Sequence, residues 1–223
     1  MGGKKLGKAR LLPRRLSPRL IVACEGEKTE YFYFTALLNY LKQIKNPAAL
    51  IPIKGTRRTS LGVVEAATQQ RNMDRRKGIF SERDNDRVYA ILDVEPHDPQ
   101  RLLLLEQALS LARKNNIHVL LSNPSFEVWL LSHLKSAAEM KRRIPSPTDA
   151  KRELATLIAS DANAAAFTRQ MEQLVKLASH AVAVAREVRE QHHKHHADTR
   201  EANAATDVYK LVAFLLGDSD PPP

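Results

Sequence analysis

The chain has only one cysteine, Cys24, and few aromatic residues, which make up 5% of its 223 residues. A single cysteine excludes an internal disulfide, and its position inside an apolar run favours a core role over that of a nucleophile. No apolar run approaches the roughly 18 residues that a membrane span needs, and no apolar signal core follows the basic N-terminus. We therefore expect a soluble, cytoplasmic protein that does not bind membranes.

Acidic residues are absent from the first 19 positions, which carry seven lysines and arginines. The formal net charge of the chain is +10, so the remaining residues contribute only +3. This composition is typical of disordered segments, and residues 1–18 are predicted to form a basic disordered tail. Such a tail either binds phosphates nonspecifically or only solubilises the terminus.

Short apolar runs alternate with helical patterns along the first half of the chain. Strands are predicted over 19–24, 50–53, 87–92 and 117–121, and helices over 29–42, 61–75, 99–114 and 126–134. Four repeats of this alternation are typical of a parallel sheet flanked by helices. The predicted fold is therefore α/β, with a small Rossmann-like parallel sheet in residues 19–135.

The second half of the chain is rich in helix-forming residues and has no strand-like run. Residues 136–217 are predicted to be a helical extension packed on the core, with a last helix over 204–216. Residues 218–223 would form a short proline-rich tail. The chain is thus interpreted as one α/β core with a helical appendage.

Acidic side chains follow the predicted strands, at the edge where ligands bind in open α/β sheets. Glu25 follows the first strand, Asp93 and Glu95 follow the third, and Glu127 begins the helix after the fourth. Clustered carboxylates repel one another unless a divalent cation neutralises them, and oxygen ligands suit Mg²⁺ or Mn²⁺. The pattern predicts metal-assisted phosphoryl transfer. The alternative is structural, with turn residues after the strands and an acid that complements a helix dipole at Glu127.

Basic residues follow the second predicted strand, in the loop before the next helix. Lys54, Arg57 and Arg58 should lie on the same rim as the acids, where they would bind phosphates of a nucleic acid. The alternative is a solvated loop. His97, two residues after Glu95, is a candidate phosphate contact or proton relay, and its alternative is an exposed loop histidine.

Four segments together resemble the RloB-like family, a TOPRIM-related group of defence proteins. They are, in chain order, IVACEGEKTEYFYF (21–34), ILDVEPHD (91–98), SNPSFEVWLLSHL (122–134) and NAATDVYKLVAFL (203–215). The resemblance spans about residues 19–216. It implies a TOPRIM-like fold, in which a small parallel sheet lies between helices.

The resemblance also implies roles for individual residues. The TOPRIM glutamate at the end of the first strand acts as general acid or base and corresponds to Glu25. The paired metal-binding acids, usually Asp-x-Asp, correspond to Asp93 and Glu95, so this chain departs from the pattern at Glu95. A glutamate in the first helix of related nucleases supplements the metal site and corresponds to Glu30. The alternative for Glu30 is a first-turn acid that only complements the helix dipole. The family pattern also suggests that Lys210 in the last helix reaches the nucleic acid.

The first hypothesis is an endonuclease, dependent on Mg²⁺ or Mn²⁺, that acts in bacterial antiphage defence. Its substrate would be RNA, with transfer RNA as one candidate, or DNA. By resemblance, its partner would be an AAA- or ABC-type ATPase, and association into homo-oligomers is left open. The second hypothesis is a non-catalytic nucleic-acid or effector-binding module with a degenerate TOPRIM site, which Glu95 keeps open. The third is a hydrolase of small phosphate esters.

Overall fold

The computed structural model describes residues 17–26, 28–46, 49–53, 59–140, 142–158, 164–193, 199–218 and 220–222. These residues include a five-stranded sheet in the order β2-β1-β3-β4-β5. The strands are β1 (Arg19–Cys24), β2 (Ala49–Ile53), β3 (Arg87–Asp93), β4 (His118–Asn123) and β5 (Ala205–Thr206). Strands β1 to β4 are parallel, and β5 pairs antiparallel with β4. The predicted Rossmann-like α/β fold is confirmed.

Alternate side chains of β1 enter two separate cores, one on each face of the sheet. Leu20, Val22 and Cys24 are buried in one core, and Ile21 and Ala23 in the other. Successive side chains of a strand point to opposite faces, and a parallel sheet is covered on both, so its strands are apolar throughout. Cys24 is therefore a core residue, as the sequence predicted.

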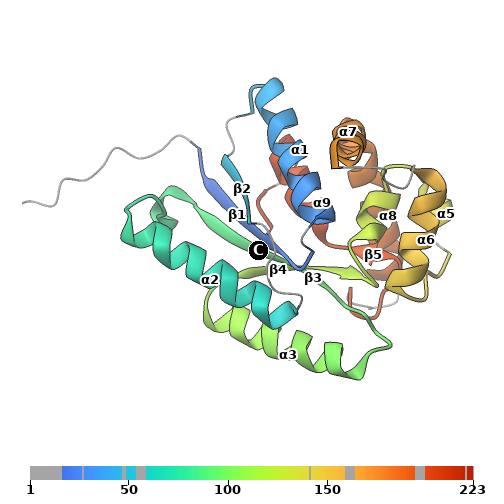
Figure 1. Cartoon of the computed structure of the whole chain (residues 1–223), viewed down its shortest axis with the longest axis horizontal. Coiled ribbons are helices and arrows are strands. Elements are labelled where there is room, and N and C mark those ends of the chain that lie inside the picture. The colour runs from blue at the N-terminus through green and yellow to red at the C-terminus, as the bar shows by residue number, and fades with distance from the viewer. Residues whose placement is uncertain are drawn as a thin grey trace, which may run out of the picture.

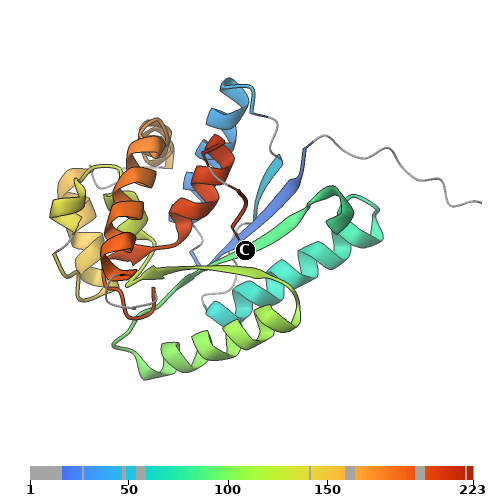
Figure 2. The ribbon, with the colours of Figure 1, turned by 180° about the vertical axis from the view of Figure 1, so that it is seen from behind.

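Helices cover both faces of this sheet (Figure 1). On one face lie α2 (Ser60–Arg76) and α3 (Pro99–Lys114), which contact each other and the central strands. On the other face lie α1 (Thr29–Gln43), α4 (Glu127–Leu131) and α9 (Val208–Leu216), seen from behind in Figure 2. A short 3₁₀ helix, η1 (Glu82–Asp84), precedes β3. The connections after β1 and β3 therefore leave toward opposite faces.

Four further helices pack on the face that carries α1. They are α5 (Ala137–Met140), α6 (Pro147–Leu157), α7 (Ala164–Val175) and α8 (Ala178–His193). Helix α6 contacts α4, α8 contacts α9, and α7 contacts α1. Phe32 of α1 meets Phe167 of α7 edge to face, with ring centroids 5.6 Å apart. These helices share one apolar core with the sheet.

The strand β5 was not expected from the sequence, which predicted a helix from residue 204. Ala204 has a φ of 60°, which is incompatible with a right-handed helix, and α9 begins only at Val208. The Thr206 and Ser122 hydroxyls are 2.7 Å apart, and the Asp207 N–H donates to the Leu121 carbonyl at 2.7 Å. Tertiary bonds to β4 thus override the local helix preference.

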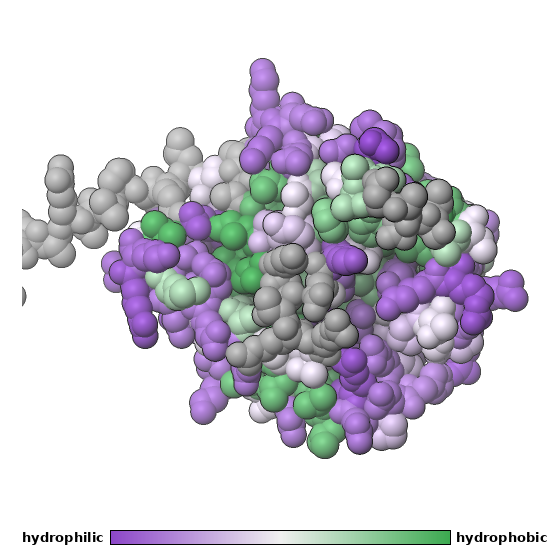
Figure 3. Space-filling view, viewed as in Figure 1, coloured by the Kyte–Doolittle hydropathy of each residue, from purple (hydrophilic) through white to green (hydrophobic). Residues whose placement is uncertain are grey.

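Residues 1–16 of the predicted tail lie outside the described residues, as do Lys54, Arg57 and Arg58. Among the helices that the structure describes, none combines the length and the apolar character that crossing a membrane requires. On the side of the molecule shown in Figure 1, hydrophilic side chains cover most of the described surface (Figure 3).

Candidate active site

The ends of β1 and β3 lie side by side at the centre of the sheet. Strand β1 has β2 on one side and β3 on the other, so the strand order reverses here. Cys24 pairs with Ile91 in parallel register, which places the following Glu25 and Asp93 at the same edge. Because the connections after the two strands leave toward opposite faces, a crevice forms between them, and this is where open α/β sheets bind ligands.

Five carboxylates line one cavity of about 390 Å³ at this edge. They belong to Glu25, Glu30, Asp93, Glu95 and Glu127. Glu30 and Glu127 are only 7% and 6% exposed. The structure therefore brings together all five acids that the sequence singled out, from the connections after β1, β3 and β4.

Glu30 lies in the first turn of α1 and folds back over the end of β1. The Gly26 N–H donates to Glu30 Oε1 at 3.0 Å. A β-carbon at position 26 would lie 1.8 Å from Glu30 Oε2, so the glycine makes room for this carboxylate. Burial, together with the neighbouring charges of Glu127 and Glu25, raises the pKa of Glu30 to about 7.

Glu25 and Asp93 are also shifted toward their protonated forms. Burial, and then the nearby carboxylates of Glu30 and Glu25, raise the pKa of Asp93 well above its ordinary value. Burial raises the pKa of Glu25 too, although a hydrogen bond from Ser60 and the charge of Arg101 partly oppose this. The Ser60 hydroxyl at the start of α2 donates to Glu25 Oε1. The acids of the cavity thus repel one another in the absence of a cation.

Glu95 sits on a strained stretch of backbone. Its φ is 45°, in the left-handed region that a glutamate rarely adopts and that costs about 1 kcal/mol. The Glu95 N–H donates to the Pro124 carbonyl at 3.2 Å, and the Glu95 carbonyl accepts from the Asp98 N–H at 3.1 Å. These bonds hold the turn in place. Strain of this kind is concentrated at functional sites.

Three basic side chains share the cavity with the acids: Lys28, Arg101 and Lys151. Arg101 Nε lies 3.2 Å from Glu95 Oε2, and its Nη1 lies 3.6 Å from Glu25 Oε2. None of these three cations was among the site residues predicted from the sequence. For Arg101 a local signal existed, because Asp98 caps α3 and places Arg101 in the first turn, where a positive charge opposes the helix dipole.

The donor set of the cavity fits Mg²⁺ or Mn²⁺ in its chemistry, since it consists of carboxylate oxygens. As the side chains of the described residues stand, however, no three acids, histidines or cysteines are grouped so that they could hold a metal ion. Arg101 occupies the space between Glu25 and Glu95 instead. Ligation therefore requires side-chain rotation, first of all at Glu95.

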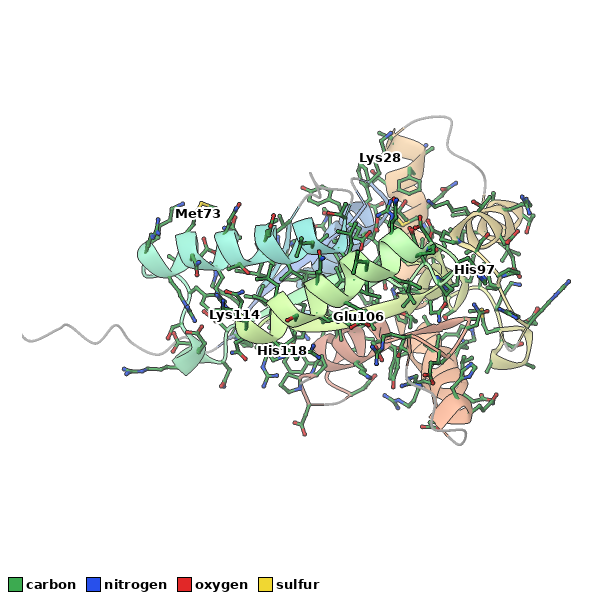
Figure 4. The ribbon with its side chains drawn as sticks, turned by 90° about the horizontal axis from the view of Figure 1, so that it is seen from below. Lys28, Met73, His97, Glu106, Lys114 and His118 are labelled. Carbon is green, nitrogen blue, oxygen red and sulfur yellow. The ribbon has the colours of Figure 1, made fainter. Side chains whose placement is uncertain are left out.

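Two predicted nucleic-acid contacts do not line this cavity. His97 is exposed and lies outside the set of lining residues (Figure 4). Lys210 Nζ pairs with Asp207 Oδ1 at 2.7 Å and lines a different cavity, of about 520 Å³, next to Arg186 and Tyr209. Their roles in binding nucleic acid stay predictions, without support from proximity to the acids.

The short segment between β4 and α4 fixes the position of the Glu127 carboxylate. Asn123-Pro124 is a cis peptide that ends β4, and α4 begins only at Glu127. The Ser125 hydroxyl donates to Glu127 Oε2 at 2.6 Å, and Lys151 Nζ lies 3.9 Å from Glu127 Oε1. Glu127 is thus held at the side of the cavity by one neighbour in sequence and one residue of α6.

Comparison with known proteins gives one family. A family model described as RloB-like protein matches residues 20–215, which include all five acids and all three cations of the cavity. No curated protein and no solved structure matches the chain.

Proposed function

The chain belongs to the RloB-like protein family, and we propose that it is a divalent-metal-dependent nuclease of the TOPRIM type. The observation that carries this proposal is the convergence of five carboxylates in one cavity at the switch point of the sheet. Bringing such charges together costs free energy unless a cation neutralises them. A bound Mg²⁺ or Mn²⁺ would offset this cost by neutralising the carboxylates.

Asp93, Glu95 and Glu30 would hold the ion, with Glu127 as a further ligand. When bound, the ion would supply Lewis-acid stabilisation of the negative charge that develops on the phosphate oxygens. Gly26 positions Glu30 through its N–H, and the left-handed turn positions Glu95. Backbone geometry would therefore help to position two of the proposed ligands.

Glu25 would act as the general base and acid. Its side chain is 11% exposed, so it reaches the cavity while remaining mostly buried. The raised pKa of Glu25 makes its carboxylate a stronger base toward an attacking water molecule, and the same group can return the proton to the leaving oxygen. Ser60 fixes the orientation of the carboxylate by hydrogen bonding to Oε1.

The biological setting rests on the RloB-like resemblance. We propose that the substrate is a nucleic acid, that cleavage serves bacterial antiphage defence, and that an AAA- or ABC-type ATPase controls it. Transfer RNA is one candidate substrate among RNA and DNA.

One observation favours a second candidate function, a non-catalytic nucleic-acid or effector-binding module. Arg101 already pairs with both Glu25 and Glu95 and thereby neutralises part of the acid cluster without a metal. In such a module, binding of the polymer would persist under metal chelation and would be indifferent to Asp93→Asn.

The deciding experiment is cleavage of mixed labelled RNA and DNA with Mg²⁺ or Mn²⁺. We compare the wild type with Glu25→Gln and Asp93→Asn, and with Glu106→Gln as a control, since Glu106 is an exposed acid of α3 paired with Arg200. We expect metal-dependent cleavage that falls by about 10²- to 10⁴-fold in the first two variants and is unchanged in the third. Equal cleavage by all four proteins would refute the proposed active site, and polymer binding without cleavage would favour the binding module.

A further inference from the structure

The acid cavity has two layers of opposite charge. Its interior is acidic, with the buried carboxylates of Glu30 and Glu127. Its three basic side chains are more exposed: Lys151 by 67%, Arg101 by 33%, and Lys28, which also lies on the surface. An anion that approaches the cavity therefore meets the cations first.

The three cations come from three separate parts of the fold. Lys28 precedes α1 and Arg101 lies in α3, so they flank the crevice from the two faces of the sheet. Lys151 belongs to α6, which reaches the cavity from the helical extension by packing on α4. Cations thus surround the cavity on more than one side.

The positions of Lys28 and Arg101 are unfavourable for local structure. Lys28 occupies the N-cap of α1 and makes no capping hydrogen bond, although an N-cap favours Ser, Thr, Asp or Asn. Arg101 places a positive charge in the first turn of α3, against the helix dipole. Lys28 and Arg101 both line the same cavity. Side chains that are unfavourable for the local secondary structure are typical of functional sites.

Lys151 contributes little to the stability of the fold. Its 3.9 Å approach to Glu127 is at the limit of an ion pair, and its side chain is mostly in solvent, where such pairs contribute about 0–1 kcal/mol. The ammonium group is therefore available to an anion at the cavity with little loss elsewhere.

We propose that Lys28, Arg101 and Lys151 form a phosphate-binding mouth that holds the backbone of a nucleic acid on both sides of the bond above the acids. This inference rests on the proposed function and deepens it. Cations on several sides of a buried acid cluster suit a chain of phosphodiesters, because phosphates flank the reacting one in both directions. A small phosphate monoester has no such neighbours. The helical extension would then supply part of the substrate site through Lys151.

The test measures binding of labelled RNA and DNA oligonucleotides as a function of salt concentration. All proteins carry Asp93→Asn, so that cleavage does not interfere. Lys28→Gln, Arg101→Gln and Lys151→Gln are made singly and together. The matched controls are Lys77→Gln, Arg113→Gln and Lys114→Gln, since these exposed cations lie in or just after the last turns of α2 and α3, at the opposite edge of the sheet.

Each mouth substitution should reduce the slope of log K against log salt by about 0.7 to 0.9, and the triple variant should bind roughly 10- to 100-fold more weakly. The controls should leave the slope unchanged. Arg101→Lys should keep the slope, since it keeps the charge, and so serves as a second variant at that position. Thermal unfolding of each variant confirms that it folds.

The outcomes separate this inference from the proposed function. If the triple variant binds with the affinity and slope of its parent, while the chain with Asp93 intact cleaves nucleic acid, the phosphate-binding mouth is wrong and the nuclease stands. If the parent binds no polymer and the chain with Asp93 intact cleaves none, or turns over only a phosphate monoester, both proposals fail.

Discussion

Gly26 and Glu30 are in direct contact across the first turn of α1: the Gly26 N–H donates to Glu30 Oε1 at 3.0 Å, and a β-carbon on residue 26 would overlap Glu30 Oε2. The φ of Gly26 lies outside the left-handed region. The glycine is thus needed for the space it leaves and not for its backbone conformation. A larger side chain at position 26 would therefore displace the Glu30 carboxylate, which allows the role of Glu30 to be tested.

Gly26→Ala should displace Glu30 from the cavity. The overlapping atoms are the far end of the flexible Glu30 side chain, which can rotate away, so we expect little change in the free energy of unfolding but weaker Mn²⁺ binding by titration calorimetry. Adding Glu30→Ala to Gly26→Ala should weaken Mn²⁺ binding no further, because the Glu30 carboxylate has already left the cavity. Full Mn²⁺ affinity in Gly26→Ala would show that Glu30 is not a ligand.

Asp93→Asn should stabilise the metal-free protein while abolishing its response to metal. The substitution removes a charge from a cluster whose members repel one another, so we expect a gain of about 1 kcal/mol in the free energy of unfolding in EDTA. Mn²⁺ should raise the melting temperature of the wild type but not of this variant. Glu106→Gln, outside the cavity, should behave as the wild type does. Equal metal stabilisation of all three proteins would contradict the assignment.

Arg101→Gln should affect metal binding and polymer binding in opposite directions. Arg101 pairs with Glu95, one of the proposed ligands, and its positive charge opposes a cation in the cavity. Its removal should therefore tighten Mn²⁺ binding by about fivefold, the equivalent of roughly 1 kcal/mol for a partly exposed ion pair. The same variant should bind nucleic acid more weakly. Arg113→Gln, in the last turn of α3, should change neither. Weaker Mn²⁺ binding by Arg101→Gln would show that Arg101 supports the ion rather than competing with it.

A buried histidine should make stability depend on pH. The Tyr33 hydroxyl lies 3.1 Å from His133 Nε2, and His133 Nδ1 lies 2.9 Å from the Trp129 carbonyl, which fits a neutral ring that donates from Nδ1. Burial lowers the pKa of His133 from 6.5 to about 4. Above pH 6.5 this contribution to stability is complete. As the pH falls from 6.5 toward 4, the unfolded state binds a proton at this histidine that the folded state does not, so the contribution of His133 to the free energy of unfolding should fall by about 3 kcal/mol. The raised pKa values of Glu30, Glu25 and Asp93 act in the opposite direction, so the His133 contribution is the difference between the wild type and a His133 variant.

Urea denaturation between pH 6.5 and pH 4 measures this effect. His133→Gln should lack this part of the pH dependence, whereas His97→Gln, at an exposed histidine outside this cluster, should retain it. A profile that is the same in His133→Gln and the wild type would rule out His133 as its source.

The acids at the strand ends could be predicted from the sequence, because each of them directly follows an apolar run that marks a buried strand. Apolar runs such as those ending at Cys24 and Leu92 predict buried parallel strands, and the carboxyl ends of such strands meet at one edge. Glu25 and Asp93 therefore had to lie near each other once the strands were recognised. The RloB-like resemblance added Glu30, whose contact with Gly26 no periodicity could reveal.

The cations of the cavity could not be predicted in this way, because tertiary packing places them. Lys151 is more than 50 residues from Asp93 in the sequence, and only the contact between α6 and α4 carries it to the cavity. Ser60 meets Glu25 through the packing of α2 on β1. Strand β5 escaped prediction for a similar reason, since two residues are too short to show a period.

The left-handed backbone at Glu95 has a consequence for directed evolution of this protein. Asparagine or glycine adopts that conformation at lower cost, and an amide at position 93 relieves the charge repulsion. A library screened for thermal tolerance alone should therefore accumulate substitutions at these two positions. Heat-resistant clones from such a screen would be folded proteins that have lost the cavity's acids, so a selection for robustness needs a parallel selection for metal binding.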